Sequence, residues 1–170
     1  SWDETHNRDF GQCTYDYVFS SSPSDECIRS EHGTIHSPLY ELFLVSLEHV
    51  FKIEDTRRVF LVRHLVMFLV FFIGVIGFYH LGLRVFDNWM FALLACLLLV
   101  LTPRIFADSF YNSVDIGALV VFVLSINTLL WFSESPNIIR AFFHGLMCAI
   151  AVDIRMTSML VVVMTGYFFL

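Results

Sequence analysis

The stretch from Thr102 to Asp115 carries the residue types best suited to chemistry. It lies between two strongly apolar runs, 89–101 and 116–132, yet it contains an arginine, two aspartates, an asparagine and a tyrosine. Polar and charged groups at the depth or edge of a membrane are energetically costly, so they tend to mark a pathway or a site. A loop that only reverses the chain between two helices does not need this set of side chains.

Arginines approach this stretch from three segments of the chain. Arg104 lies inside it, Arg63 lies one turn into the first long apolar run, and Arg155 separates two later apolar segments. The guanidinium group is a planar, permanently charged fork of donors that matches phosphate oxygens. The three arginines therefore predict a phosphate group held at the membrane boundary. The alternative is that they extend towards lipid headgroups or pair with aspartates such as Asp108 and Asp115.

Acidic residues at the beginning of the chain are candidates for a general base. Asp3 and Glu4 are adjacent, and His6 follows them. A carboxylate that comes within about 2.6–3.2 Å of a hydroxyl group can accept its proton; the alternative is the solvated start of an acidic loop. His36 precedes an apolar helical pattern and is a candidate substrate contact. The spacing of these histidines and carboxylates matches no known metal site, so a divalent metal cofactor is not favoured.

The composition predicts an integral membrane protein. Of the 170 residues, 57% are apolar and 15% are charged, whereas about 25% are charged in soluble domains. The formal net charge is −6, and residues 1–55 hold 11 of the 16 acidic residues. This excludes a nucleic-acid partner, which requires a basic surface. Because the chain starts without Met and stops inside an apolar run, we expect it to be a fragment of a larger membrane protein.

Hydropathy and helical periodicity divide the chain into a polar loop, residues 1–58, and a transmembrane region, residues 59–170. Within the loop, a helix over about 38–52 places its apolar residues on one stripe, which is typical of an amphipathic helix in the membrane interface. The alternative is a surface helix packed on a neighbour. Transmembrane spans are predicted at about 59–80, 87–102, 116–132, 138–152 and 156–170. The last two are either two short spans or one broken helix.

Two features bear on the side of the membrane that the polar loop occupies. Cys13 and Cys27 lie in this loop and can form a disulfide if the loop is extracytoplasmic; two free thiols are an equal alternative. Cys96 and Cys148 fall in apolar runs, where packing is the expected role. Arginines are more frequent on the side of the loop and the candidate site than on the opposite side. By the positive-inside rule, that count alone would make the site face cytoplasmic.

Taken together, these motifs resemble the membrane glycosyltransferases of family 39, which include protein O-mannosyltransferases and lipid A aminoarabinose transferases. The resemblance rests on the order and spacing of Asp3-Glu4 with His6, His36-Ser37-Pro38-Leu39, Arg63-His64, Pro103-Arg104-Ile105-Phe106 through Asn112 to Asp115, and Asp153-Ile154-Arg155. The chain departs from the family pattern at Val114, where relatives often have lysine, and at Ser37, where they often have a second proline.

The resemblance implies a GT-C fold, which is an all-α bundle of transmembrane helices with a large extracytoplasmic first loop. It also implies that the fragment begins after the first transmembrane helix. The implied donor is a sugar linked to a polyprenyl or dolichyl phosphate, and the acceptor is a protein, lipid or glycan. The site is then expected on the extracytoplasmic side of a bacterial plasma membrane or, in a eukaryote, of the endoplasmic reticulum membrane.

The resemblance also implies roles for individual residues. Asp3 maps to the general base, with Glu4 beside it. The residues expected to stabilise the leaving carrier phosphate are Arg104, Arg155 and Arg63. The residues expected to bind the substrate are His6, His36, Asn112 and Asp115. The alternative function is a non-enzymatic transporter or assembly scaffold for lipid-linked sugars, in which arginines line a path without a base near them.

Overall fold

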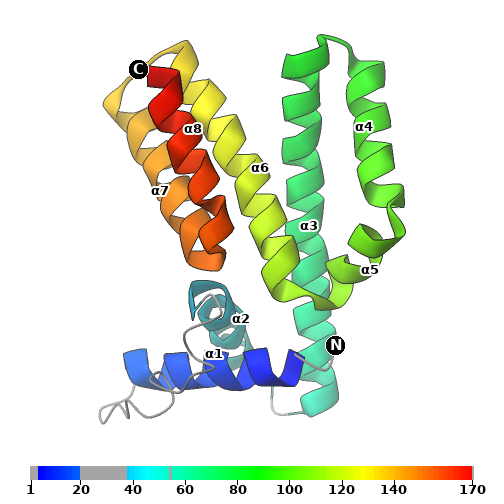
Figure 1. Ribbon diagram of the computed structural model, residues 1–170. Helices are drawn as coiled ribbons and strands as arrows, with labels where there is room; N and C mark the ends of the chain where they lie inside the picture. The colour runs from blue at the N-terminus through cyan, green and yellow to red at the C-terminus, as the bar shows by residue number, and fades with distance from the viewer. Residues whose placement is uncertain (1–3, 20–37, 54, 170) are drawn as a thin grey trace.

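The computed structural model describes residues 4–19, 38–53 and 55–169 (Figure 1). Asp3, Cys27 and His36 lie outside these ranges, so the predictions made for them stay predictions. Every regular element in the described part of the chain is helical. This confirms the all-α class that the sequence predicts.

The helices follow one another along the chain, with one short 3-10 turn near the end. Their bounds are α1 (Glu4–Phe19), α2 (Pro38–Val50), α3 (Thr56–Phe86), α4 (Trp89–Leu101), α5 (Pro103–Tyr111), α6 (Ser113–Glu134), α7 (Ile138–Ile154), η1 (Met156–Ser158) and α8 (Met159–Phe169).

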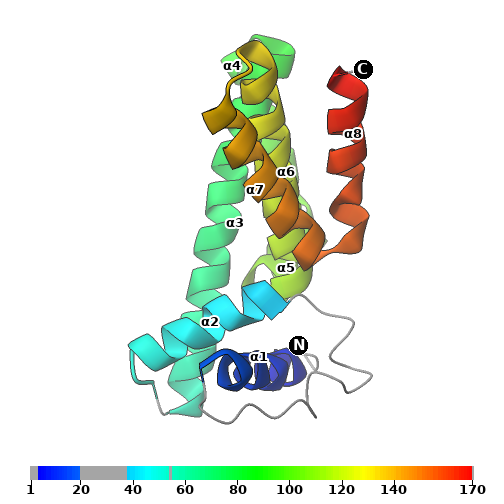
Figure 2. The same cartoon turned by 90° about the vertical axis from the view of Figure 1, so that its left-hand side faces the viewer.

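Long helices stand on a layer formed by two shorter ones. The longest helix, α3, packs against α4 and α6, while α7 and α8 pack alongside α6 (Figure 1). Helices α1 and α2 lie across one end of this bundle, and α5 lies at the same end (Figures 1 and 2). The elements that carry the sequence-predicted site residues therefore gather at one end of the molecule.

Two helices in the described part of the chain are long and apolar enough to cross a membrane, α3 with 31 residues and α6 with 22. At 1.5 Å per residue they measure about 46 Å and 33 Å, against a hydrocarbon core of roughly 30 Å. The pair α4 and α5, bent by 67°, makes a third span if it is counted as one. Helices α7 and α8, where two further spans are predicted, have only 17 and 11 residues. The protein is thus a membrane protein whose described residues are all-α and hold two or three candidate spans.

Polar side chains at the breaks between apolar runs fix the helix ends. The predicted span 59–80 lies inside α3, which extends beyond it at both ends from its N-cap at Asp55. The next helix, α4, is capped by Asn88, whose side chain accepts a hydrogen bond from the amide of Met90 at 2.8 Å. Such caps satisfy amide groups that the first turn of a helix leaves without partners.

Helix α1 forms where the sequence predicts an irregular polar loop. Its buried residues are Asn7, Phe10, Gly11 and Thr14. Gly11 brings α1 close to α2, because a Cβ at this position would lie 3.0 Å from the carbonyl oxygen of Glu41. The helix has no apolar stripe that a periodicity argument could detect. It depends on tertiary packing, which supplies most helix stability in proteins.

Helix α2 turns its charged side inward. Its buried residues are Tyr40, Glu41, Leu44, Val45 and Glu48. Several residues of the predicted apolar stripe are instead exposed, namely Leu39, Phe43 and Val50. These exposed apolar side chains are accessible to lipids, as those of an interfacial helix have to be.

Helices α3 and α6 approach each other closely at Gly74. A Cβ added at this glycine would lie 2.6 Å from Cγ2 of Val120, which is buried. A β-branched side chain cannot easily turn away from such a contact. Glycine is therefore required here by the helix–helix distance.

We expect Gly74→Ala to lower stability by about 1–3 kcal/mol through overpacking, although alanine is the better helix former. The loss should appear in the apparent Tm of the detergent-solubilised protein. In a Val120→Ala background the same change should cost little, because the clashing methyl group is absent. Gly145→Ala is the matched control, since a Cβ there meets nothing within 4 Å. An equal loss at Gly145 and Gly74 would contradict the close approach.

Candidate functional site

A buried network of charged groups joins α1 and α2 to the bundle. Arg63, which is 2% exposed, donates one N–H to Oε1 of Glu48 at 2.8 Å and another to Oε2 of Glu41. The second oxygen of Glu48 accepts a hydrogen bond from Arg8 at 3.0 Å. The second oxygen of Glu41 accepts one from the hydroxyl of Ser113 at 2.6 Å. The network thus links α1, α2, α3 and the start of α6.

This network changes the role assigned to Arg63. The sequence predicts that Arg63 binds the donor phosphate, but its guanidinium group is buried and faces two carboxylates. A phosphate could reach it only by displacing one of these glutamates into a poorly solvated environment, which is costly for a charged group. We therefore reassign Arg63 as a structural residue and leave it out of the donor site.

Glu4, one of the predicted catalytic acids, lies at the start of α1 beside α3. Its Oε1 is 2.6 Å from Nε2 of His64, which follows Arg63 in the chain. The other predicted acid, Asp3, lies outside the described residues. His6 is exposed on the next part of α1. The beginning of the described chain is thus held against α3 at the end of the bundle where α5 lies (Figure 1).

The stretch that holds Arg104 folds as a short amphipathic helix, α5. It begins at Pro103, which suits the first position of a helix because this position needs no amide hydrogen. One side of α5 faces α3, where the rings of Phe110 and Phe68 stack with their centroids 5.2 Å apart. Arg104 is 89% exposed and lies 3.8 Å from the carboxylate of Asp108. Its charge therefore points away from the packed face.

Asn112 and Arg155 both bind Asp115, which lies at the edge of a pocket. Nδ2 of Asn112 donates to Oδ2 of Asp115 at 2.9 Å, while its Oδ1 accepts from the amide of Asp115 and caps α6. Arg155 donates to the other carboxylate oxygen of Asp115. Asp115 and Arg155 line a pocket of about 310 Å³, and the rest of its lining is partly polar and partly apolar: Thr157, Ser158, Ala118, Leu119 and Phe122. The side chains of Asp115 and Arg155 are 40% and 51% exposed, so solvent or a ligand can reach both.

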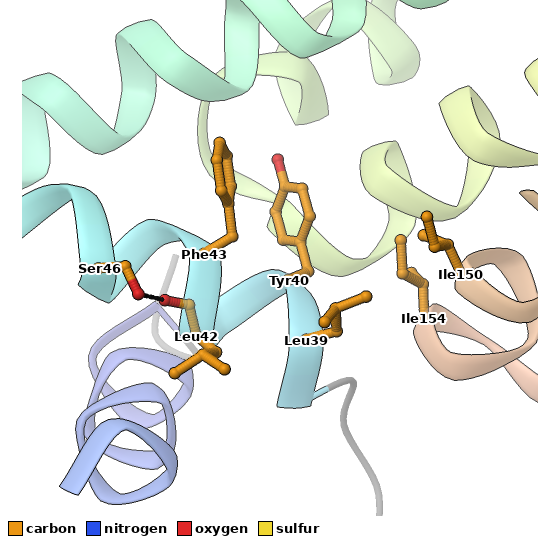
Figure 3. Close-up of a pocket in the computed structure, with 7 residues that line it drawn as sticks. All are labelled: Leu39, Tyr40, Leu42, Phe43, Ser46, Ile150 and Ile154. Carbon is orange, nitrogen blue, oxygen red and sulfur yellow. Dashed lines mark hydrogen bonds between the residues drawn. The ribbon is translucent and has the colours of Figure 1, made fainter. Parts of the chain in front are cut away.

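A second, apolar pocket of about 390 Å³ lies where α2 meets α7. Figure 3 shows the rings of Tyr40 and Phe43 projecting from α2, with Leu39 pointing toward Ile154 of α7. Burial raises the pKa of the Tyr40 hydroxyl, so this group stays neutral and adds no charge. Ile154 lines this apolar pocket, and the next residue, Arg155, lines the pocket of Asp115. Together the two pockets offer an apolar surface beside a cation.

The structure thus sorts the predicted site residues into groups. Asn112, Asp115 and Arg155 are brought together, whereas Arg104 lies on the exposed side of α5 and is not part of their pocket. Within the described residues, no group of three or more histidine, cysteine or acidic side chains is placed to hold a metal ion. Cys13 is disulfide-bonded, and Cys96 and Cys148 are free and buried.

The sequence argument missed Glu41 and Glu48 as partners of Arg63. A detectable signal was their separation by seven residues, because this spacing places both on one side of a helix. Two carboxylates on one helical side, followed by an arginine inside an apolar run, indicate a buried ion pair. The contribution of Arg8 from α1 had no comparable signal.

We expect Arg63→Met to lower the free energy of unfolding by about 3–5 kcal/mol, because it leaves buried carboxylates without their counter-charge. Arg84→Met on the same helix is the matched control. Arg84 lies 3.4 Å from Glu134, and both side chains are well exposed, so its loss should cost about 1 kcal/mol or less. Denaturant or thermal unfolding in detergent measures both. Equal losses for the two variants would contradict a stabilising role of the buried network.

Comparison with known proteins identifies no relative. No protein-family model matches the chain, and no match is found among curated proteins or among solved structures. The functional argument therefore rests on the residues and their geometry.

Proposed function

We propose that the chain is part of a membrane glycosyltransferase that moves a sugar from a polyprenyl or dolichyl phosphate to an acceptor hydroxyl or phosphate. The observation that carries this proposal is the ion pair of Asp115 and Arg155, which lines an accessible pocket and is held on one side by Asn112. The apolar pocket that begins at Ile154 suits part of the isoprenoid chain of the donor. The cation suits the phosphate group of a lipid-linked sugar, and the apolar surface suits its isoprenoid chain.

The charge that develops during transfer explains the use of arginine. The donor is a phosphodiester with one negative charge, and the carrier leaves as a monoester with a greater charge. A guanidinium group has five N–H donors, and Asp115 engages only part of the fork of Arg155. The remaining donors can bind the leaving phosphate, an interaction that strengthens as the bond to the sugar breaks. Arg104, exposed on α5, would add a second positive charge.

The acceptor is activated on the other side of the sugar. Asp3 takes the proton of the acceptor hydroxyl, and the freed oxygen forms a bond to the anomeric carbon. The bond from this carbon to the carrier oxygen breaks, so the configuration is inverted. Glu4, the residue after Asp3 in the chain, is held beside α3 by His64. His6 and His36 would contact the sugar or the acceptor.

The chemistry of the first segment supports an extracytoplasmic site. A disulfide at Cys13 is typical of an oxidising compartment. The arginine count that argues for the cytoplasmic side includes Arg63, whose charge is matched by buried glutamates, so its weight is reduced. We therefore propose a bacterial plasma membrane or an endoplasmic reticulum membrane, with the pocket on the extracytoplasmic side.

Replacement of the proposed base should abolish transfer. In the full-length protein, Asp3→Asn should lower kcat about 10²–10⁴-fold, the range that general bases contribute. The measurement is release of a labelled sugar from a polyprenyl phosphate donor onto an acceptor. Donor binding should be unchanged, because Asp3 acts on the acceptor. Activity near wild type would refute the assignment of Asp3, and binding of the donor without transfer by the wild-type protein would favour the transporter or scaffold.

Replacement of the proposed phosphate ligand should weaken both binding and transfer. Arg155→Ala should reduce kcat/KM about 10²–10³-fold, the scale of losing one electrostatic stabiliser of a transition state. Arg155→Lys should recover only part of this loss, because lysine has no planar fork. Arg84→Ala, a cation at the opposite end of α3, is the control and should keep full activity. A similar loss at both positions would show that the effect is not specific to the pocket.

A further inference from the structure

A third pocket lies at the corner between α2 and α3, away from the residues of the proposed donor site. Its volume is about 580 Å³, and its lining includes Phe51, Lys52, Asp55, Arg58 and Leu61. Phe51 and Leu61 are 64% and 58% exposed. The pocket therefore combines exposed apolar surface with two basic side chains.

The length of α3 places this corner at the level of lipid headgroups. The helix measures about 46 Å, which exceeds the hydrocarbon core by roughly 16 Å. The polar layer of α1 and α2 lies beside the first turns of α3 (Figures 1 and 2), and Arg63 is paired with glutamates there. The surplus length of α3 therefore extends beyond the core at its Thr56 end, where Arg58 lies.

The charges in the pocket are available to an external anion. Arg58 is 80% exposed, and its contact with Asp55 is 3.8 Å long and solvent-exposed, which makes it a weak ion pair. Asp55 is also engaged by the amide of Arg57, because it caps α3. Lys52 has a left-handed backbone with φ 50°, a conformation at the end of a helix that glycine usually occupies. The sequence thus has a lysine at a position where the backbone conformation alone would favour glycine.

We propose that this corner binds an anionic phospholipid of the surrounding membrane. Lys52 and Arg58 hold the phosphate of the headgroup, and the exposed rings and methyl groups of Phe51 and Leu61 contact the first part of the acyl chains. Basic residues beside the apolar end of a membrane helix are suited to such lipids. The occupant is a lipid and not a soluble phosphate, because the exposed apolar side chains of Phe51 and Leu61 line the pocket beside the basic ones.

Native mass spectrometry of the full chain in detergent, titrated with phosphatidylglycerol or phosphatidylcholine, tests this proposal. The wild-type protein should bind phosphatidylglycerol more tightly than phosphatidylcholine. Lys52→Gly and Arg58→Ala should each weaken phosphatidylglycerol binding roughly fivefold, which corresponds to about 1 kcal/mol per basic side chain. Binding of phosphatidylcholine should not change. Lys52→Gly should keep the Tm of the wild type or raise it, because glycine fits the left-handed backbone.

Arg57→Ala is the matched control, because it removes the same charge next to Arg58 from a residue that does not line the pocket. It should keep most of the phosphatidylglycerol preference. Equal losses for Arg57→Ala and Arg58→Ala would mean general electrostatic attraction and would overturn the site. The proposal is also overturned if the wild-type protein does not distinguish the two lipids, or if millimolar inorganic phosphate displaces phosphatidylglycerol.

Discussion

The pairing of Arg63 with Glu41 and Glu48 is the constraint on which one end of the molecule depends. A charged group next to the hydrocarbon core must have its charge and its hydrogen bonds matched by other protein groups. Here the charges of Arg63 and Arg8 are balanced by those of Glu41 and Glu48, which accept hydrogen bonds from both arginines; Nε of Arg63 alone has no hydrogen-bond partner among the described residues. Because the partners come from three helices, none of these helices can rotate or withdraw without exposing an unmatched charge. The need to keep these buried charges paired therefore fixes the position of α1 and α2 on the bundle.

This pairing also decides which face of α2 meets the membrane. With Glu41 and Glu48 directed inward, Phe43 stays exposed and forms one wall of the apolar pocket together with the buried Tyr40 (Figure 3). Glu41 also accepts a hydrogen bond from Ser113, the first residue of α6. Asn112 and Asp115 flank Ser113, so the buried network and the accessible pocket share one turn of backbone. The arrangement of the site therefore depends on the buried charges of Arg63 and Glu41, which do not contact the ligand.

Much of the fold could be predicted from the sequence because it depends on local properties. The lengths of the apolar runs predict α3 and α6, and Pro103 with its polar neighbours predicts the break after α4. The partners of Arg63 could not be identified in this way, since residue type alone does not distinguish a ligand-binding arginine from a paired one. Helix α1 was missed because it is stabilised by contact with α2. Asp115 and Arg155 are 40 positions apart in the sequence. Hydrophobic periodicity describes only local structure, so it could not predict their contact.

The bend between α4 and α5 has a consequence for the membrane itself. Helix α4 has 13 residues, so its apolar length is about 20 Å, well short of a core of roughly 30 Å. Beyond it, α5 turns by 67° and runs sideways. A bilayer in contact with α4 can match this length by becoming thinner, at a modest elastic cost per ångström. Where it does so, the headgroups of one leaflet are drawn inward beside α5, and the distance between the lipid phosphates and Arg104 becomes shorter.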